Sequence, residues 1–307
     1  MMRVLGLLLL AVAAAALAAR FTPASNRWIL AGAALSPYLM LGAPLAVLAF
    51  GVSRHWTLVS VAAVLTVVVL AVQAPRYIGS PAPDTGAALR FVSANLLLGE
   101  ADPAAVTALA AEHADILAVQ ELTPELSAAL SRALAADFPY SALRPRDRAA
   151  GVGLWSRYPI TASGSDESFS RGLIYARVQV PGVDAETIVL STHMPPPRSA
   201  FASWRTDITR LGPALRELPD DGPIVIGADL NASPDVREFR QLLTDGYRDG
   251  AAQAGAGLTR THPSNVIIPP LLAVDHIITR DATVTSLRTV EVAGSDHLAL
   301  VATVVLG

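Results

Sequence analysis

The sequence contains no cysteine and no lysine, and each absence narrows what the chain can do. Without cysteine there are no disulfides and no thiolate ligands, so a metal site must use oxygen or nitrogen donors. The redox compartment therefore stays open, because cysteine usage is the feature that would indicate it. Without lysine, every fixed positive side chain is an arginine. Together with the abundance of alanine, this indicates a genomic bias and carries little functional content.

Acidic residues are missing from residues 1–80, a region with five arginines that is dominated by alanine, leucine and valine. Residues 81–307 hold all 26 acidic residues and the other 18 arginines, which gives that part a net charge of −8. The composition therefore divides the chain into an apolar N-terminal region and a polar, acidic remainder.

Three apolar stretches occupy residues 4–19, 29–52 and 57–74. The second and third are long enough, as helices, to cross a hydrocarbon core of about 30 Å. The first, VLGLLLLAVAAAALAA after MMR, is shorter and has the form of a signal-peptide core or a short transmembrane helix. A buried helical hairpin of a soluble protein is the less favoured alternative, because no charge interrupts either long stretch. We expect a transmembrane region of about three helices over residues 1–75.

The orientation of this region is nearly balanced by charge. With three spans, two arginines (Arg3, Arg54) lie on one side and three (Arg20, Arg27, Arg76) on the other, so a raw count tilts against an outside C-terminal domain. Cleavage of the first segment followed by two crossings places that domain outside, and so do three crossings from a cytoplasmic N-terminus. Only three crossings from an outside N-terminus leave it in the cytoplasm. We expect a multi-pass protein of the cell membrane with an extracytoplasmic domain.

Residues 76–87 are expected to be a linker, because they are rich in proline, glycine and small residues and have no periodicity. Over residues 88–307, β-type runs such as DILAVQEL, TIVLSTHM and PIVIGADLN alternate with helical stretches such as FASWRTDITRLGPALREL. Strands and helices interspersed in this way predict an α/β fold with the sheets inside and the helices outside.

Polar side chains recur where these apolar runs stop. A carboxylate or amide at the mouth of a buried strand costs free energy unless something there uses it. Each has a plain structural explanation when taken alone, but so many at successive strand ends indicate one site. Carboxylates, amides and imidazoles without thiols suit a hard cation such as Mg²⁺ or Mn²⁺, with imidazoles left for a phosphate. The positions are Asn95, Glu121, His193, Asp229, Asn231, Asp275, His276, Asp296 and His297.

The ordered motifs SANLLLG, DILAVQE, GVGLWSRYPI, STHM, GADLNASPD, VDHI and GSDHLAL resemble the endonuclease/exonuclease/phosphatase superfamily. That superfamily includes DNase I-like nucleases, sphingomyelinases and inositol-polyphosphate phosphatases. The resemblance covers residues 88–307, and GADLN and SDH are its most specific pieces. It implies a DNase I-like four-layered α/β sandwich and a metal-dependent phosphatase or phosphodiesterase.

The resemblance also implies a metal site for Mg²⁺ or Mn²⁺. Glu121 corresponds to the metal-binding glutamate, and Asn95 to the asparagine of the first strand that helps to hold the site. Asp296 resembles a further carboxylate of that site.

Five residues take catalytic roles by the same resemblance. Asp229 orients or deprotonates the attacking water, and Asn231 beside it bonds the phosphate. His193 contacts the scissile phosphate, and His297, polarised by Asp275, binds it. Together these roles describe in-line displacement at phosphorus.

Two weaker features stay open. His262 in the THP motif either reaches the substrate or simply replaces an aromatic residue. The RPRDR segment either grips an anionic head group or is a solvated loop partly compensated by Asp147; its arginines are Arg144, Arg146 and Arg148.

Charge and architecture favour one substrate class. A net charge of −8 weakens the nuclease reading, because proteins that track a phosphate backbone usually carry a basic footprint. The apolar N-terminal region favours a lipid phosphate at the membrane surface. This architecture resembles the VanJ-type membrane proteins linked with glycopeptide antibiotic resistance, which implies action near cell-wall lipid intermediates, such as a polyprenyl (pyro)phosphate. A tethered extracellular nuclease and, less favoured, a non-catalytic binding module are the alternatives; the oligomeric state is open.

Overall fold

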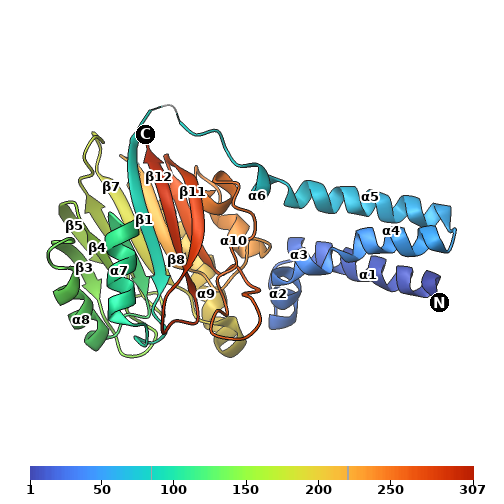
Figure 1. Ribbon diagram of the computed structural model, residues 1–307, viewed down its shortest axis with the longest axis horizontal. Coiled ribbons are helices and arrows are strands. Elements are labelled where there is room, and N and C mark those ends of the chain that lie inside the picture. Colours follow the sequence, from blue (N-terminus) through green and yellow to red (C-terminus); the bar gives the residue numbers. More distant parts are fainter. Residues whose placement is uncertain (84, 220) are drawn as a thin grey trace.

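The computed structural model of the chain describes residues 1–83, 85–219 and 221–307, and its larger part contains two six-stranded mixed sheets (Figure 1). The first sheet has the strand order β11 (Ala282–Glu291), β12 (Leu298–Leu306), β1 (Ala87–Asn95), β2 (Ile116–Gln120), β4 (Val152–Ser156) and β3 (Tyr140–Arg144). The second has the order β5 (Ile160–Ser165), β6 (Leu173–Val178), β7 (Thr187–His193), β8 (Ile224–Asp229), β10 (Asp275–Arg280) and β9 (Arg248–Asp249).

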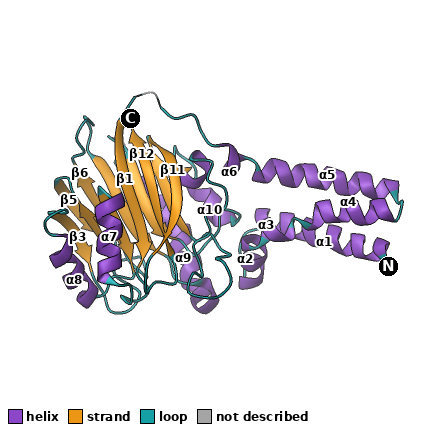
Figure 2. Cartoon of the chain, in the orientation of Figure 1, coloured by secondary structure: helices purple, strands orange, loops and turns teal. Residues whose placement is uncertain are grey.

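Helices cover both outer faces of the sheet pair (Figure 2). On the first sheet lie α7 (Pro103–His113) and α8 (Pro124–Leu134), whose first turns are capped by the side chains of Asp102 and Thr123. On the second lie α9 (Pro197–Arg216) and α10 (Arg237–Leu242), and α11 (Gly250–Gln253) is a single turn beside β9. Apolar side chains such as Ile116, Leu154 and Val225 fill the space between the sheets. The predicted four-layered α/β sandwich is confirmed.

The two sheets approach each other closely beneath the polar strand ends. A Cβ atom on Gly227 of β8 would lie 2.8 Å from Ser93 Oγ and 3.0 Å from Ala118 Cβ of the facing sheet. A glycine in GADLN is therefore required by packing, because real Cβ atoms do not come so near other atoms. This close approach lets residues from both sheets meet in one site.

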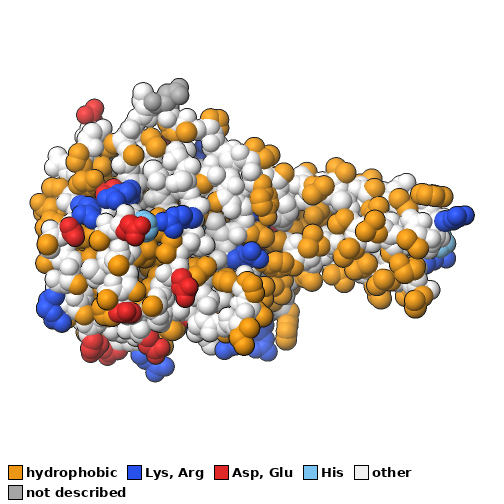
Figure 3. All heavy atoms as spheres, in the orientation of Figure 1, with side chains coloured by type: hydrophobic (Ala, Val, Ile, Leu, Met, Phe, Trp, Pro, Cys, Tyr) orange, Lys and Arg blue, Asp and Glu red, His pale blue; other side chains and the backbone are white. Residues whose placement is uncertain are grey.

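The N-terminal helices form an elongated bundle that extends from the sandwich, and its outer surface is largely apolar (Figures 1 and 3). It consists of α1 (Met2–Phe21), α4 (Gly42–Val52) and α5 (Trp56–Gln73). By length and composition α1 and α5 are each able to cross a membrane. Residues 29–52, expected to provide another span, are broken: α2 (Arg27–Ala34) and the following segment are bent by 59°.

The break turns α2 toward the α/β sandwich, and α2 packs against α9. Pro37 lies in the first turn of the short helix α3 (Ser36–Leu39), where its missing N–H and its ring prevent α2 from continuing. Leu30 and Ala33 of α2 then join the same apolar cluster as Trp204 of α9. The bent segment is therefore part of the domain's own core packing.

A buried charged cluster joins the bundle to the sandwich. Asp235, in the loop after β8, accepts hydrogen bonds from Arg20 at the end of α1, from Gln73 at the end of α5 (3.2 Å) and from Arg76 (2.9 Å) of α6 (Pro75–Ile78). Ser80 N donates to Gln253 O at 2.7 Å, so the chain after α6 also contacts the sandwich. Residue 84 of the expected linker 76–87 lies outside the described residues.

Candidate active site

Three neighbouring strands of the second sheet bring their terminal polar residues side by side. Strand β8 pairs in parallel with β7 and antiparallel with β10, and the register sets Asp229 opposite both His193 and Asp275. All three side chains are buried. The strand register alone therefore places an imidazole and two carboxylates next to one another.

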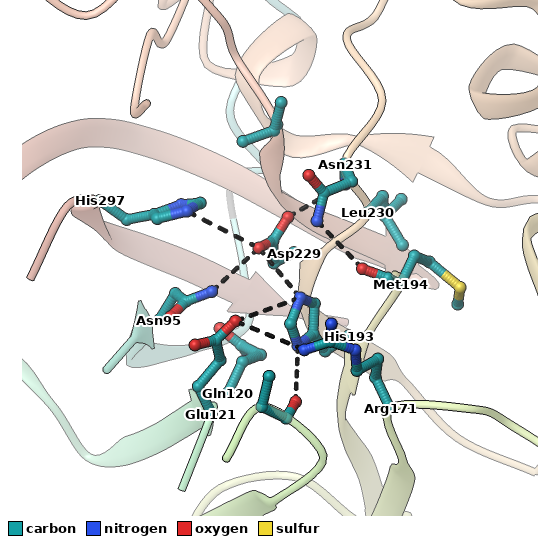
Figure 4. A network of polar contacts seen from close by, with 12 residues as sticks. Asn95, Gln120, Glu121, Arg171, His193, Met194, Asp229, Leu230, Asn231 and His297 are labelled. Atoms are coloured by element: carbon teal, nitrogen blue, oxygen red, sulfur yellow. Dashed lines mark hydrogen bonds and ion pairs between the residues drawn. The ribbon is translucent and has the colours of Figure 1, made fainter. Parts of the chain in front are cut away.

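Asp229 lies at the centre of the contacts (Figure 4). Its Oδ2 accepts a hydrogen bond of 2.9 Å from Nδ2 of Asn95, which comes from the first sheet. Its Oδ1 accepts one of 3.0 Å from the backbone N–H of Asn231. Burial, and then the charge of Asp275, raise the pKa of Asp229 to about 6, although the neighbouring imidazoles act in the other direction. A carboxylate with such a pKa is suited to accept a proton near neutral pH.

His297 and Asp275 form a buried pair. Nδ1 of His297 lies 2.7 Å from Asp275 Oδ2, and its Nε2 lies 3.9 Å from Asp229 Oδ2. Burial works to lower the pKa of His297, but the charges of Asp275 and Asp229 outweigh it and raise this pKa to about 10. The ring is therefore held as an imidazolium, a cation that faces the site.

His193 is oriented by a backbone carbonyl. Its Nδ1 lies 3.1 Å from Ala149 O, and since a carbonyl only accepts, Nδ1 carries the proton in that contact. Nε2 then faces Asp229 Oδ2 at 3.4 Å and Glu121 Oε1 at 3.7 Å. Complete burial lowers the pKa of His193, which favours its neutral ring, whereas the charges around His297 favour its protonated ring.

Glu121 is aimed into the site by an unusual backbone. Its φ is 60°, in the left-handed region that side chains other than glycine rarely adopt. Its Oε2 accepts a hydrogen bond of 2.7 Å from Leu98 N, and Leu97 N donates to Asn95 Oδ1 at 2.9 Å. The turn after β1, in the SANLLLG motif, thus fixes Asn95 and Glu121 together.

The donor set fits a hard divalent cation. Among the described residues, none donates a hydrogen bond to Glu121 Oε1, which lies 3.7 Å from Nε2 of His193 and 3.9 Å from Nη1 of Arg171. Burial raises the pKa of Glu121, so a bound cation would stabilise its charged form. The Asp296 carboxylate lies 3.9 Å from Nε2 of His297. A ligand role for Asn95 stays a prediction, since both ends of its amide already make hydrogen bonds.

The structure brings eight of the nine polar positions predicted from the sequence to one end of the sandwich. Asn231 is held by a 3.0 Å hydrogen bond from its Nδ2 to Met194 O. His262 lies at the edge, with its ring centroid 4.5 Å from that of His297. His276, by contrast, supports the loop after β8 from outside the site, because its Nε2 contacts Ala232 O at 2.8 Å and its ring packs on Phe239.

Other residues of the site escaped the sequence reasoning. Gln120, buried beside Glu121, donates to Ser191 Oγ at 3.1 Å and so ties the two sheets together beneath the site. Its place at the end of DILAVQ was the available signal. Arg171 lies in a loop without a pattern that marks it. Of the arginines of RPRDR, Arg144 and Arg146 pair with Glu167, and a head-group role for the segment stays a prediction.

Comparisons with known proteins agree with this geometry. The model of the Endonuclease/Exonuclease/phosphatase family matches residues 92–297. No curated protein matches the chain significantly. Among solved structures, D. rerio TDP2 complexed with a single-strand DNA product is 18% identical with a TM-score of 0.60, over 71% of this chain and 99% of that one. An endonuclease/exonuclease/phosphatase from Bacteroides vulgatus is 16% identical with a TM-score of 0.60, over 72% and 100%. At these identities the likeness concerns the fold.

Proposed function

Because the chain belongs to the endonuclease/exonuclease/phosphatase family, we propose that it is a divalent-metal-dependent phosphohydrolase acting on a lipid phosphate at the extracytoplasmic membrane surface. The bond cleaved is a phosphoester or a pyrophosphate. The observation that carries the catalytic part is the position of Asp229, a proton-accepting carboxylate between the imidazoles of His193 and His297. Members of the family are generally hydrolases of phosphoester bonds, and the buried carboxylates and imidazoles of the site support such a reaction when a divalent cation is bound.

The residues divide the work of an in-line displacement. Asp229 takes a proton from water as the water oxygen bonds to phosphorus and the bond to the leaving oxygen breaks; that oxygen then takes up a proton from solvent. The imidazolium of His297, kept charged by Asp275, stabilises the negative phosphoryl oxygens. His193, whose Nδ1 proton faces Ala149 O, donates from Nε2 to the phosphate as an imidazolium, a form that the negative charge of a bound phosphate favours. When bound at Glu121 and Asp296, with Asn95 beside them, Mg²⁺ or Mn²⁺ would supply Lewis-acid stabilisation of the same oxygens.

A membrane lipid is the favoured substrate because of the N-terminal bundle. Large apolar side chains are exposed along α1, α4 and α5, among them Leu8, Leu48 and Val64, each at least 60% exposed. Such a surface is stable in lipid and costly in water. The alternative of a tethered nuclease draws support from the fold shared with the TDP2–DNA complex, but the net charge of residues 81–307 is −8.

The arginine distribution supports an extracytoplasmic site. Two of the three arginines at the domain end of the bundle, Arg20 and Arg76, are engaged by Asp235 and so have a structural reason for their position. At the far end, Arg3 and Arg54 have no carboxylate partner in the described part of the chain. When the positive-inside rule is applied to Arg3 and Arg54 alone, it favours a cytoplasmic far end of the bundle and an active site outside the cell. The VanJ-type resemblance implies the same orientation.

One panel of substrates tests the activity. The full chain in lipid nanodiscs with Mg²⁺ should release phosphate from hexadecyl phosphate or hexadecyl diphosphate, lose this activity with EDTA, and leave single-stranded DNA intact. Asp229→Ala should abolish release, whereas Asp184→Ala, at an exposed position, should not. Degradation of DNA without lipid turnover would establish the nuclease alternative. Wild-type activity in Asp229→Ala, or turnover unaffected by EDTA, would refute the mechanism.

A further inference from the structure

An open groove of about 750 Å³ runs between α2 and the loop that follows β8. This volume lies in the range of small-molecule binding sites, roughly 300–1,000 Å³. One wall consists of Leu30, Ala31 and Ala34 of α2, and the other includes Val236, Leu272 and Val274 of the sandwich. The lining is therefore mainly apolar and is built jointly by the N-terminal segment and the catalytic sandwich.

The groove is continuous with the active site. Asn231, whose N–H bonds Asp229, lines the groove, and so does His262, whose ring stacks 4.5 Å from His297. A molecule whose phosphate is placed among Asp229, His193 and His297 can therefore extend its remaining part into this groove. The two regions together form one binding surface with a polar and an apolar end.

Two arginine side chains lie beside the apolar walls of the groove. Arg27 and Arg198 line the groove, both are exposed, and neither has a carboxylate partner among the described residues. Arg27 lies over the ring of Trp28, 5.3 Å from its centroid. Arginine and tryptophan beside an apolar surface are typical of the membrane interface, where the cation contacts an anionic head group and the ring lies at the same level.

We propose that this groove binds the hydrocarbon chain of a phosphorylated lipid while the active site holds its phosphate, and that Arg27 and Arg198 contact a further negative group of the head. The inference rests on the proposed function for the position of the phosphate. A lipid chain is the occupant because α2, which lines the groove, is joined through the short helix α3 to the apolar bundle, and Leu39 and Leu41 on that connection are exposed. A chain can then enter the groove without crossing water.

A substitution that fills the groove separates chain binding from chemistry. Ala31→Trp places a large ring against the wall of α2, and Leu35→Trp is the matched control at an exposed position outside the groove. With full-length protein in nanodiscs, kcat/KM of Ala31→Trp should fall about tenfold or more for hexadecyl phosphate and stay within about twofold for butyl phosphate, whose chain is too short to use the groove. Leu35→Trp should resemble the wild type with both. An equal effect on the two esters, or none, would overturn the proposal.

A second measurement locates the chain without catalysis. Hexadecyl phosphate with a photoreactive diazirine in its chain should label peptides containing residues 27–34 and 272–274 of the wild type, and Ala31→Trp should lose this labelling. Two results would overturn the groove assignment even if phosphate release is observed. One is labelling spread evenly over α1, α4 and α5. The other is labelling that is displaced by a co-purifying protein but not by unlabelled hexadecyl phosphate. Groove labelling without phosphate release would instead refute the proposed function and leave the binding site standing.

Discussion

Asp229 and Asp275 are buried carboxylates of adjacent strands, yet their environments drive their pKa values in opposite directions. Burial works to raise the pKa of Asp275, but the charge of His297 and its hydrogen bond lower it below the ordinary value. For Asp229, burial and the charge of Asp275 win, and the pKa rises to about 6. Two neighbouring carboxylates with separated pKa values are typical of a site in which one stays charged and the other exchanges a proton.

The role of Asp275 leads to a prediction for Asp275→Asn. The amide oxygen still accepts a hydrogen bond from Nδ1 of His297 but no longer balances its charge, so we expect kcat to fall on the order of 10²-fold. Steady-state phosphate release by the full-length protein measures this. Asp115→Asn is the control, since Asp115 is a buried carboxylate that pairs with Arg90 at the opposite end of β2.

The Tm of both variants is measured by thermal unfolding, which distinguishes a loss of folded structure from a loss of catalytic activity. Asp115→Asn should keep its kcat even if its Tm falls. A wild-type kcat in Asp275→Asn with an unchanged Tm would contradict the charge-balancing role of Asp275.

Site residues at strand ends could be predicted because the pairing of strands brings together residues that are far apart in the sequence. Asp229 ends the apolar run of GADLN and Asp275 opens the strand in VDHI, and antiparallel pairing of these two strands sets the two residues opposite each other. Gln120 was missed because a single glutamine after an apolar run also suits a turn. The left-handed φ of Glu121 and the carbonyl of Ala149 that orients His193 depend on loop geometry, which has no periodicity to read.

At the scale of elements, the loop between β8 and α10 serves both the site and the bundle. Its first residues include Asn231, and its later residue Asp235 is completely buried and bound by Arg20, Gln73 and Arg76. The last letter of GADLNASPD therefore holds the ends of α1 and α5 against the sandwich. The sequence alone does not mark this aspartate, because its partners lie more than 150 positions away.

Asp235→Ala should strongly destabilise this junction. It leaves two guanidinium groups buried without a partner, a change that typically costs about 3–5 kcal/mol. We expect a lower Tm in detergent and faster proteolysis within residues 74–83. Asp245→Ala is the control, since Asp245 pairs with Arg216 at the surface at 3.8 Å and such pairs contribute about 0–1 kcal/mol. Equal Tm values for the two variants would show that the cluster does not hold the bundle.

At the scale of the whole molecule, hydropathy revealed apolar stretches but not their directions. Residues 57–74 form one helix as expected, whereas residues 29–52 divide, and α2 leaves the bundle to pack beside α9. The sequence gives a length for such a stretch, and only tertiary contacts such as those of Leu30 decide where it goes. The charge count was ambiguous for a related reason, because Arg20 and Arg76 have partners that are distant in sequence.

The absence of cysteine makes the orientation directly measurable, because each introduced thiol is the only one in the chain. Gly307→Cys marks the exposed C-terminus of the sandwich, and Ser53→Cys marks the turn between α4 and α5 at the far end of the bundle. On intact cells, a membrane-impermeant maleimide should label Gly307→Cys and should reach Ser53→Cys only after permeabilisation, because positive loops stay in the cytoplasm. The reverse pattern would place the active site in the cytoplasm, and labelling of both thiols on intact cells would show that the bundle does not span the membrane.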